Sequence, residues 1–126
     1  MNILLADDQS QIRSALRLLL EQEPGIVVAG EVANARDLLS QIQILQADMV
    51  LLDWEVPGME AERTLARLRA LCPTVAVVAL SGRPEARDAS LVAGVDAFVS
   101  KIDPPDRLLE TVQALVSDQQ RERASS

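Results

Sequence analysis

Five short apolar runs alternate with longer stretches of helical period, and this alternation restricts the possible folds more than any other feature of the chain. The runs are almost continuously apolar, as in Val75–Leu80, which is typical of strands covered on both faces by helices. The predicted strands are Asn2–Ala6, Ile26–Ala29, Met49–Leu52, Val75–Leu80 and Ala97–Val99. The predicted helices are Gln9–Gln22, Asn34–Leu45, Glu60–Leu71, Pro84–Ala93 and Pro104–Gln119. Five βα units in series, each crossing over right-handed, predict an α/β fold with a doubly wound five-stranded parallel sheet.

Helical spacing and end signals support these boundaries. In the first helix Ile12, Leu16 and Leu19 follow the spacing of a buried stripe, while Arg13 and Arg17 fall on the outer face. Asn34 is a suitable cap for the second helix, and Gly94 follows the fourth where a left-handed residue is favoured. Pro84 and Pro104 fit the first turns of their helices, where the missing N–H is not needed.

Size and charge exclude several classes of protein. A chain of 126 residues fits one domain. Its net charge of −7 argues against autonomous nucleic-acid binding, which needs a basic surface. No apolar run reaches the roughly 18 residues of a membrane span, and no signal peptide precedes the first strand, so we expect a cytoplasmic location. Residues 1–118 are predicted to form the domain, and 119–126 a polar, fraying tail or the start of a linker.

Polar residues follow four of the predicted strands. They are Asp7 and Asp8, Asp53, Ser81, and Lys101. In an open parallel sheet these strand ends meet at the edge where ligands bind. Crowded carboxylates favour a divalent cation, and Mg²⁺ prefers oxygen ligands beside phosphate oxygens. A carboxylate next to bound Mg²⁺ can attack phosphorus and form an aspartyl phosphate, with the lysine and the serine hydroxyl neutralising phosphoryl oxygens.

Each residue also has a simpler interpretation. Asp7 and Asp8 are good helix caps, Asp53 and Ser81 suit turns, and Lys101 taken alone is a surface lysine. Three further residues have such an alternative. Phe98 also suits a plain core position, and Glu55 and Arg83 also suit solvated surface charges. Only the ordered set of residues across five βα units favours the functional interpretation.

That ordered set resembles the receiver domain of bacterial two-component response regulators, a flavodoxin-like (βα)5 fold. The resemblance rests on Asp7-Asp8, on Asp53 followed by Pro57-Gly58, on Ser81, and on Lys101 preceded three residues earlier by Phe98. It covers the chain from Asn2 to about Ser117. The segments Glu23–Glu31 and Arg67–Arg69 further resemble receivers of the NarL/FixJ-like group.

The resemblance implies a role for each matching residue. Asp53 would be the phosphoacceptor. Asp8, Asp53 and the backbone carbonyl of Glu55 would hold Mg²⁺, and Asp7 would act mainly through a water molecule. Lys101 would pair with the phosphoryl group. Ser81 would swing inward to bind it, and Phe98 would follow by turning from an exposed to a buried rotamer.

The resemblance also implies partners. By the resemblance the phosphoryl group comes from a phosphohistidine. Since the chain contains no histidine, a separate sensor histidine kinase or phosphotransfer protein would donate it. Phosphorylation would reshape the surface formed by the fourth helix, fifth strand and fifth helix. A homodimer formed on phosphorylation is one expected outcome. Stand-alone receivers and receivers joined to a DNA-binding domain both fit the polar ending.

Some residues depart from the family pattern. Glu55 stands two residues after the acceptor, and Arg83, two residues after Ser81, is placed to pair with it; both are expected to alter phosphorylation or dephosphorylation rates. Two other functions stay open. One is a Mg²⁺-dependent phosphohydrolase with Glu55 as general acid, and the other is a pseudo-receiver that binds a partner without phosphorylation.

Overall fold

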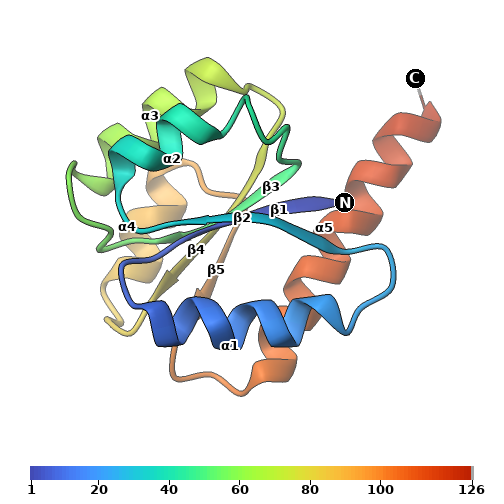
Figure 1. Ribbon diagram of the computed structural model, residues 1–126, viewed down its shortest axis with the longest axis horizontal. Helices are drawn as coiled ribbons and strands as arrows, with labels where there is room; N and C mark the ends of the chain where they lie inside the picture. Colours follow the sequence, from blue (N-terminus) through green and yellow to red (C-terminus); the bar gives the residue numbers. More distant parts are fainter. Residues whose placement is uncertain (126) are drawn as a thin grey trace.

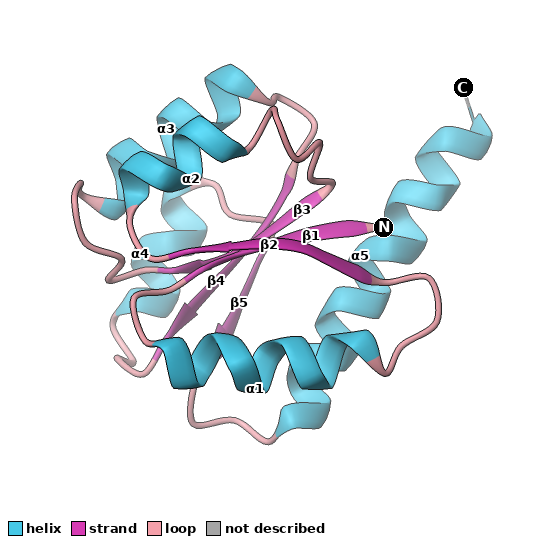
Figure 2. Ribbon diagram, in the orientation of Figure 1, coloured by secondary structure: helices cyan, strands magenta, loops and turns pink. Residues whose placement is uncertain are grey.

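The computed structural model describes residues 1–125 and has a single sheet of five parallel strands in the order β2-β1-β3-β4-β5 (Figures 1 and 2). The strands are β1 Asn2–Ala6, β2 Val27–Val32, β3 Met49–Asp53, β4 Ala76–Ser81 and β5 Ala97–Ser100. The helices are α1 Ser10–Glu21, α2 Ala35–Gln41, α3 Ala61–Leu71, α4 Ala86–Ala93 and α5 Pro105–Ser125. The predicted doubly wound parallel fold is confirmed. Among the described residues no helix is long and apolar enough to cross a membrane.

Helices cover both faces of the sheet, as the continuously apolar strands predicted. Figure 1 shows α2, α3 and α4 on one face and α1 and α5 on the other. Successive strand residues point to opposite faces. In β1, for example, Leu4 packs into the core under α2 and α3, and Leu5 packs into the core under α1 and α5. All five residues of β3 are buried.

Strand β2 continues three residues beyond its predicted end at Ala29. The register shifts between Ile3 and Leu4 of β1, and after this shift β2 stays paired with β1 at Gly30 and Glu31. A Cβ at Gly30 would lie 2.6 Å from Leu45 Cδ1, so this position favours glycine. The prediction ended the strand too early because β2 is an edge strand, where a glycine and a charged residue are tolerated.

Several helix boundaries also differ from the prediction. Asn34 caps α2 as predicted, its side chain accepting a bond from the Asp37 N–H at 2.8 Å, but α2 ends at Gln41 rather than Leu45. Pro84 and Pro104 lie just before α4 and α5 rather than in their first turns. Gly94 has the expected left-handed conformation, with φ of 109°.

Helix α5 is longer than predicted. It runs to Ser125 rather than ending near Gln119, so the polar tail is helical in the structure. Its last turns have no apolar stripe to predict them, and an ion pair between Arg121 and Asp118 lies on this extension. The division into a domain over residues 1–118 and a linker stays a prediction.

Strand register brings the predicted site residues to one level. The chain crosses from β1 to β2 on one side and returns to β3 on the other, so β1 and β3 flank the switch point where parallel sheets bind ligands. Ala6 pairs with Leu52, which leaves Asp7 beside Asp53. Asp53 pairs with Leu80, and the Lys101 N–H donates to the Ser81 carbonyl at 2.9 Å.

Candidate functional site: an acidic cluster at the carboxyl edge of the sheet

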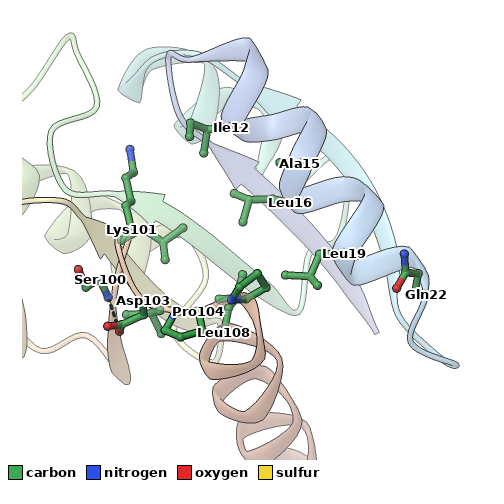
Figure 3. A pocket seen from close by; sticks show the side chains of 13 residues that line it. Ile12, Ala15, Leu16, Leu19, Gln22, Ser100, Lys101, Asp103, Pro104 and Leu108 are labelled. Carbon is green, nitrogen blue, oxygen red and sulfur yellow. Dashed lines mark hydrogen bonds between the residues drawn. The ribbon is translucent and has the colours of Figure 1, made fainter.

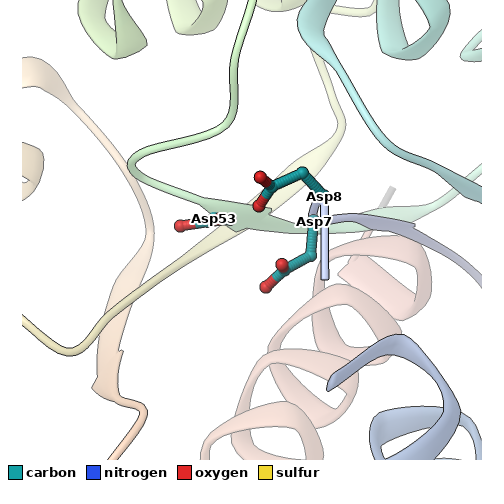
Figure 4. Close-up of side chains that lie close together, drawn as sticks. All are labelled: Asp7, Asp8 and Asp53. Carbon is teal, nitrogen blue, oxygen red and sulfur yellow. The ribbon is translucent and has the colours of Figure 1, made fainter. Parts of the chain in front are cut away.

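Three aspartates meet where β1 and β3 end (Figure 4). Asp7, Asp8 and Asp53 each place a carboxylate oxygen within 4.8 Å of the others. Asp7 and Asp53 are buried, with 1% and 3% of their surface exposed, whereas Asp8 is exposed. One carboxylate therefore faces solvent, and two lie at the base of the cluster.

Backbone and ammonium groups hold the two buried carboxylates. Asp7 Oδ1 accepts a bond from the Gln9 N–H at 2.9 Å, and Asp53 Oδ1 accepts one from the Glu55 N–H at 3.0 Å. Lys101 Nζ lies 2.8 Å from Asp7 Oδ2 and 3.4 Å from Asp53 Oδ1. Asp7 and Asp8 do not cap α1, whose cap residue Gln9 makes no side-chain capping bond.

The electrostatics of the cluster are unbalanced. Burial raises the pKa of Asp53, and the negative charges of Asp7 and Glu55 add to this rise against the lowering effects of the Glu55 N–H and Lys101. Burial alone would lower the pKa of Lys101, but its bond to Asp7 and the charges of both aspartates outweigh burial and raise it. The site thus penalises the charged form of Asp53 and favours the ammonium form of Lys101.

Ser81 ends β4 beside this cluster, and its hydroxyl has partners the sequence did not predict. It is fully buried. Its Oγ donates to Glu55 Oε1 at 2.6 Å and accepts a bond from the Arg83 N–H at 3.0 Å. The expected Glu55–Arg83 pair is not formed. The Arg83 side chain instead donates to Glu85 at 3.0 Å, where both side chains are 65% exposed.

Comparison with known proteins identifies the family. The model of the response regulator receiver domain matches residues 3–113. This chain belongs to that family. The receiver is 32% identical to the nitrate/nitrite response regulator NarL of Escherichia coli K12 over 112 residues, which are 87% of this chain and 52% of NarL. For NarP of the same organism the identity is 33% over 117 residues, covering 89% of this chain and 53% of NarP.

Solved structures agree with this assignment. The receiver superposes on a CheY-like receiver domain protein from Methanospirillum hungatei JF-1 with a TM-score of 0.84 and 30% identity. That match covers 96% of this chain and 97% of the other. Together these matches confirm a receiver of the NarL/FixJ-like group in a two-component system. The chain spans about half the length of the curated relatives NarL and NarP.

The donor set of the receiver fits a divalent cation. Three carboxylates face one ammonium group, which leaves an excess of negative charge at the sheet edge. Carboxylate oxygens are the ligands that Mg²⁺ prefers, and the exposed carboxylate leaves an open side for water or phosphate oxygens.

Two aromatic residues lie close in sequence to the site. Phe98 on β5 is partly buried and packs against the core on the α2, α3 and α4 face. It thus lies between the fully exposed and fully buried positions that the family resemblance implies. Trp54 follows Asp53 directly and is 9% exposed. Its backbone N–H donates to the Leu80 carbonyl at 2.8 Å.

The structure adds Arg13 to the neighbourhood of the site. It was predicted on the outer face of α1, but its side chain is only 18% exposed. It donates to the Asp7 carbonyl at 2.6 Å and to Glu31 Oε1 at 3.0 Å, linking α1 and β2 to the loop of Asp7. The helical spacing of α1 did not predict this contact, because the partner, Glu31, lies on a different element, β2.

An apolar groove of about 370 Å³ adjoins Lys101 between α1 and the start of α5 (Figure 3). Ile12, Leu16 and Leu19 line one wall and Pro104 and Leu108 the other. The predicted stripe on α1 is therefore only half buried, and in this helix Leu20 alone is fully buried. None of the three aspartates lines the groove, but Lys101 does, so the groove meets the acidic cluster at this side chain.

Proposed function

We propose that this receiver accepts a phosphoryl group on Asp53 and thereby switches the surface formed by α4, β5 and α5. One observation carries the proposal: the buried Asp53 carboxylate lies beside two further carboxylates and 3.4 Å from the Lys101 ammonium. This set of groups neutralises phosphoryl oxygens and offers a nucleophile. Phosphoryl transfer depends mostly on such positioning and charge neutralisation.

As expected of a receiver domain, the donor is a phosphohistidine; the chain has no histidine, so a separate sensor histidine kinase or phosphotransfer protein supplies it. A carboxylate oxygen of Asp53 attacks the phosphorus, the new O–P bond forms, and the P–N bond to the donor breaks. The electron pair of the broken bond stays on the imidazole nitrogen. Water later attacks the same phosphorus and restores the carboxylate.

Mg²⁺ is the cofactor that we propose for this site. Asp8, Asp53 and the Glu55 carbonyl would hold it, with Asp7 acting through a water molecule. When bound, Mg²⁺ supplies positive charge that offsets the carboxylates and the phosphoryl oxygens. Lys101, which bridges Asp7 and Asp53 in the structure, turns to a phosphoryl oxygen.

The switch starts at two neighbouring strand ends. Ser81 donates its hydroxyl to the phosphoryl group, and Phe98 turns further into the core beside β4, where Ala79 pairs with it. A local change in charge thus shifts the equilibrium between two packing arrangements of this surface. The altered surface then controls an output partner or domain, including a homodimer. Glu55 sets the rates, Arg83 changes them only weakly through solvent, and DNA contact is left to another domain or protein.

Incubation with acetyl phosphate and Mg²⁺ tests the proposal. Intact-protein mass spectrometry should show one added phosphoryl group on the wild type, and Trp54 fluorescence should change, because Trp54 adjoins Asp53. Beryllofluoride, a mimic of the phosphoryl group, should give the same fluorescence change. Asp53→Asn should show neither response.

Two results would contradict the proposal. The first is an equal response from wild type and Asp53→Asn, which would place the phosphoryl group elsewhere. The second is no response from the wild type, as expected of a pseudo-receiver. Rapid turnover of a generic phosphate ester would instead support the phosphohydrolase.

A further inference from the structure

The hydroxyl of Ser81 is fully engaged without any phosphoryl group. A serine hydroxyl has one proton to donate, and in the structure it goes to Glu55 Oε1 at 2.6 Å. The oxygen also accepts the Arg83 N–H at 3.0 Å. A phosphoryl oxygen on Asp53 would need the same hydroxyl proton that Ser81 already donates to Glu55.

We infer that Glu55 is a positioning residue that competes with the phosphoryl group for the Ser81 hydroxyl proton. The inference rests on the proposed function, since its competitor is a phosphoryl group on Asp53. Glu55 holds the unphosphorylated arrangement of β4 and its following loop. Each switching event must break the Glu55–Ser81 bond before Ser81 binds the phosphoryl group.

The loop geometry makes Glu55 a persistent competitor. Its backbone N–H is bonded to Asp53 Oδ1 at 3.0 Å, so the residue that accepts from Ser81 is tethered to the acceptor itself. Bonds to an ionised acceptor are stronger than those between neutral groups. The Ser81 end of the bond is buried, whereas the Glu55 side is exposed, so shielding from water acts at the hydroxyl end only.

The charge of Glu55 is not neutralised by a neighbouring side chain. Among the described residues Glu55 forms no salt bridge, and Arg83, the partner expected from the sequence, is paired with Glu85. Glu55 therefore acts on the phosphoryl group in two ways, by competing for the proton and by repelling the charge. Only the first depends on Ser81, so the two effects can be separated.

The test is a double-mutant cycle on beryllofluoride affinity, followed by Trp54 fluorescence at constant Mg²⁺. The four proteins are wild type, Glu55→Ala, Ser81→Ala and the double variant. Glu55→Ala should tighten binding about fivefold, the scale of one bond to a charged group reduced by partial exposure. In the Ser81→Ala background the same change should have an effect below about twofold, because no hydroxyl is left to release.

Two further variants refine the cycle. Glu55→Gln keeps an acceptor oxygen without the charge, so it should tighten binding less than Glu55→Ala, and this comparison does not require the buried Ser81→Ala variant to fold. Glu62→Ala removes an equal charge from the exposed first turn of α3. It should leave the affinity unchanged.

The possible failures are distinct. If Glu55→Ala tightens binding equally with and without the Ser81 hydroxyl, repulsion alone is at work and the competition is refuted. If Glu55→Gln and Glu55→Ala have the same beryllofluoride affinity, the competition for the Ser81 proton is likewise refuted. If the wild type binds no beryllofluoride, the proposed function fails, and the competition fails with it.

Discussion

The two edges of the sheet use the same acidic residue type in opposite ways. At the carboxyl edge, Asp7 and Asp53 share the Lys101 ammonium group, and the exposed Asp8 carboxylate lies beside them. At the amino edge, Asp48 accepts a bond from the Asn2 N–H at 2.8 Å, and Asp96 accepts one from the Val77 N–H at 2.7 Å. Asp7 and Asp53 also accept backbone N–H bonds, so the difference is crowding: three carboxylates meet within 4.8 Å at the carboxyl edge. The amino-edge bonds stabilise the fold, whereas the crowding of like charges at the carboxyl edge lowers stability.

Asp96 shows how thoroughly the amino edge is bonded. Arg69 of α3 donates to Asp96 Oδ2 at 2.9 Å and also to the carbonyls of Val75 and Gly94. One guanidinium group thus connects α3, the approach to β4 and the end of α4. Planar guanidinium groups suit such multiple contacts.

The largest effect is expected at this edge. Asp96→Ala leaves the Val77 N–H without an acceptor and removes one of the three acceptors of Arg69. The free energy of unfolding should therefore fall by about 2 kcal/mol, the cost of an unsatisfied buried donor. Urea denaturation measures this loss. Glu110→Ala, which removes an exposed acid from the middle of α5, is the matched control and should change little. Equal effects of the two variants would remove the distinction between the edges.

Mg²⁺ should act only at the other edge. At a Mg²⁺ concentration ten times the dissociation constant, binding to the native state should stabilise the wild type by about 1.4 kcal/mol. Asp8→Asn should lose most of this gain because a carboxylate ligand is gone, and thermal denaturation with and without Mg²⁺ measures it. Asp96→Ala should keep the full gain. A gain retained by Asp8→Asn would exclude its carboxylate as a ligand.

The sequence predicted the backbone of this receiver better than the contacts of its side chains. Asp7, Asp53, Ser81 and Lys101 were placed correctly because each directly follows a buried strand, and parallel register brings strand ends together. Family resemblance supplied their roles. The partner of Glu55 was missed because several donors lie within reach of a flexible acid, and strand order does not choose among them. The exposed Arg83 side chain pairs instead with Glu85 on the same loop, a contact that the sequence pattern did not predict.

The boundaries that failed have a related cause. The prediction closed β2 at Ala29 because Gly30 and Glu31 interrupt the apolar run, yet an edge strand needs only backbone pairing to continue. Arg13 and Arg17 of α1 then cover Glu31 of β2, a contact between neighbouring elements. Such contacts become visible only once the helices are placed on the sheet.

Asp53→Asn should stabilise the protein at neutral pH. Because burial, with the charges of Asp7 and Glu55, raises the pKa of Asp53 above 3.8, the native state binds its proton more tightly than the unfolded state does. Stability therefore falls as the pH rises from 3.8 through the folded pKa. At pH 7 the variant should therefore have the higher Tm, because the penalised negative charge is absent. The gain should vanish below the unfolded pKa, where both states are protonated, and a gain independent of pH would point to packing instead.

The smallest effect is expected from Arg83→Ala. The side chain lies in solvent with Glu85, whereas the contact with Ser81 comes from its backbone N–H, which alanine retains. An exposed charge acts on the phosphoryl group only through solvent, so beryllofluoride affinity should change by no more than about twofold and the change should disappear at high salt. Arg87→Ala, on the exposed face of α4, is the control for net charge and should change the affinity less, since it stands further along the chain from Ser81. A change of tenfold or more that persists in salt would mean that the Arg83 side chain enters the site. The carboxyl edge would then have a second cation, and its contrast with the amino edge would lose its main support.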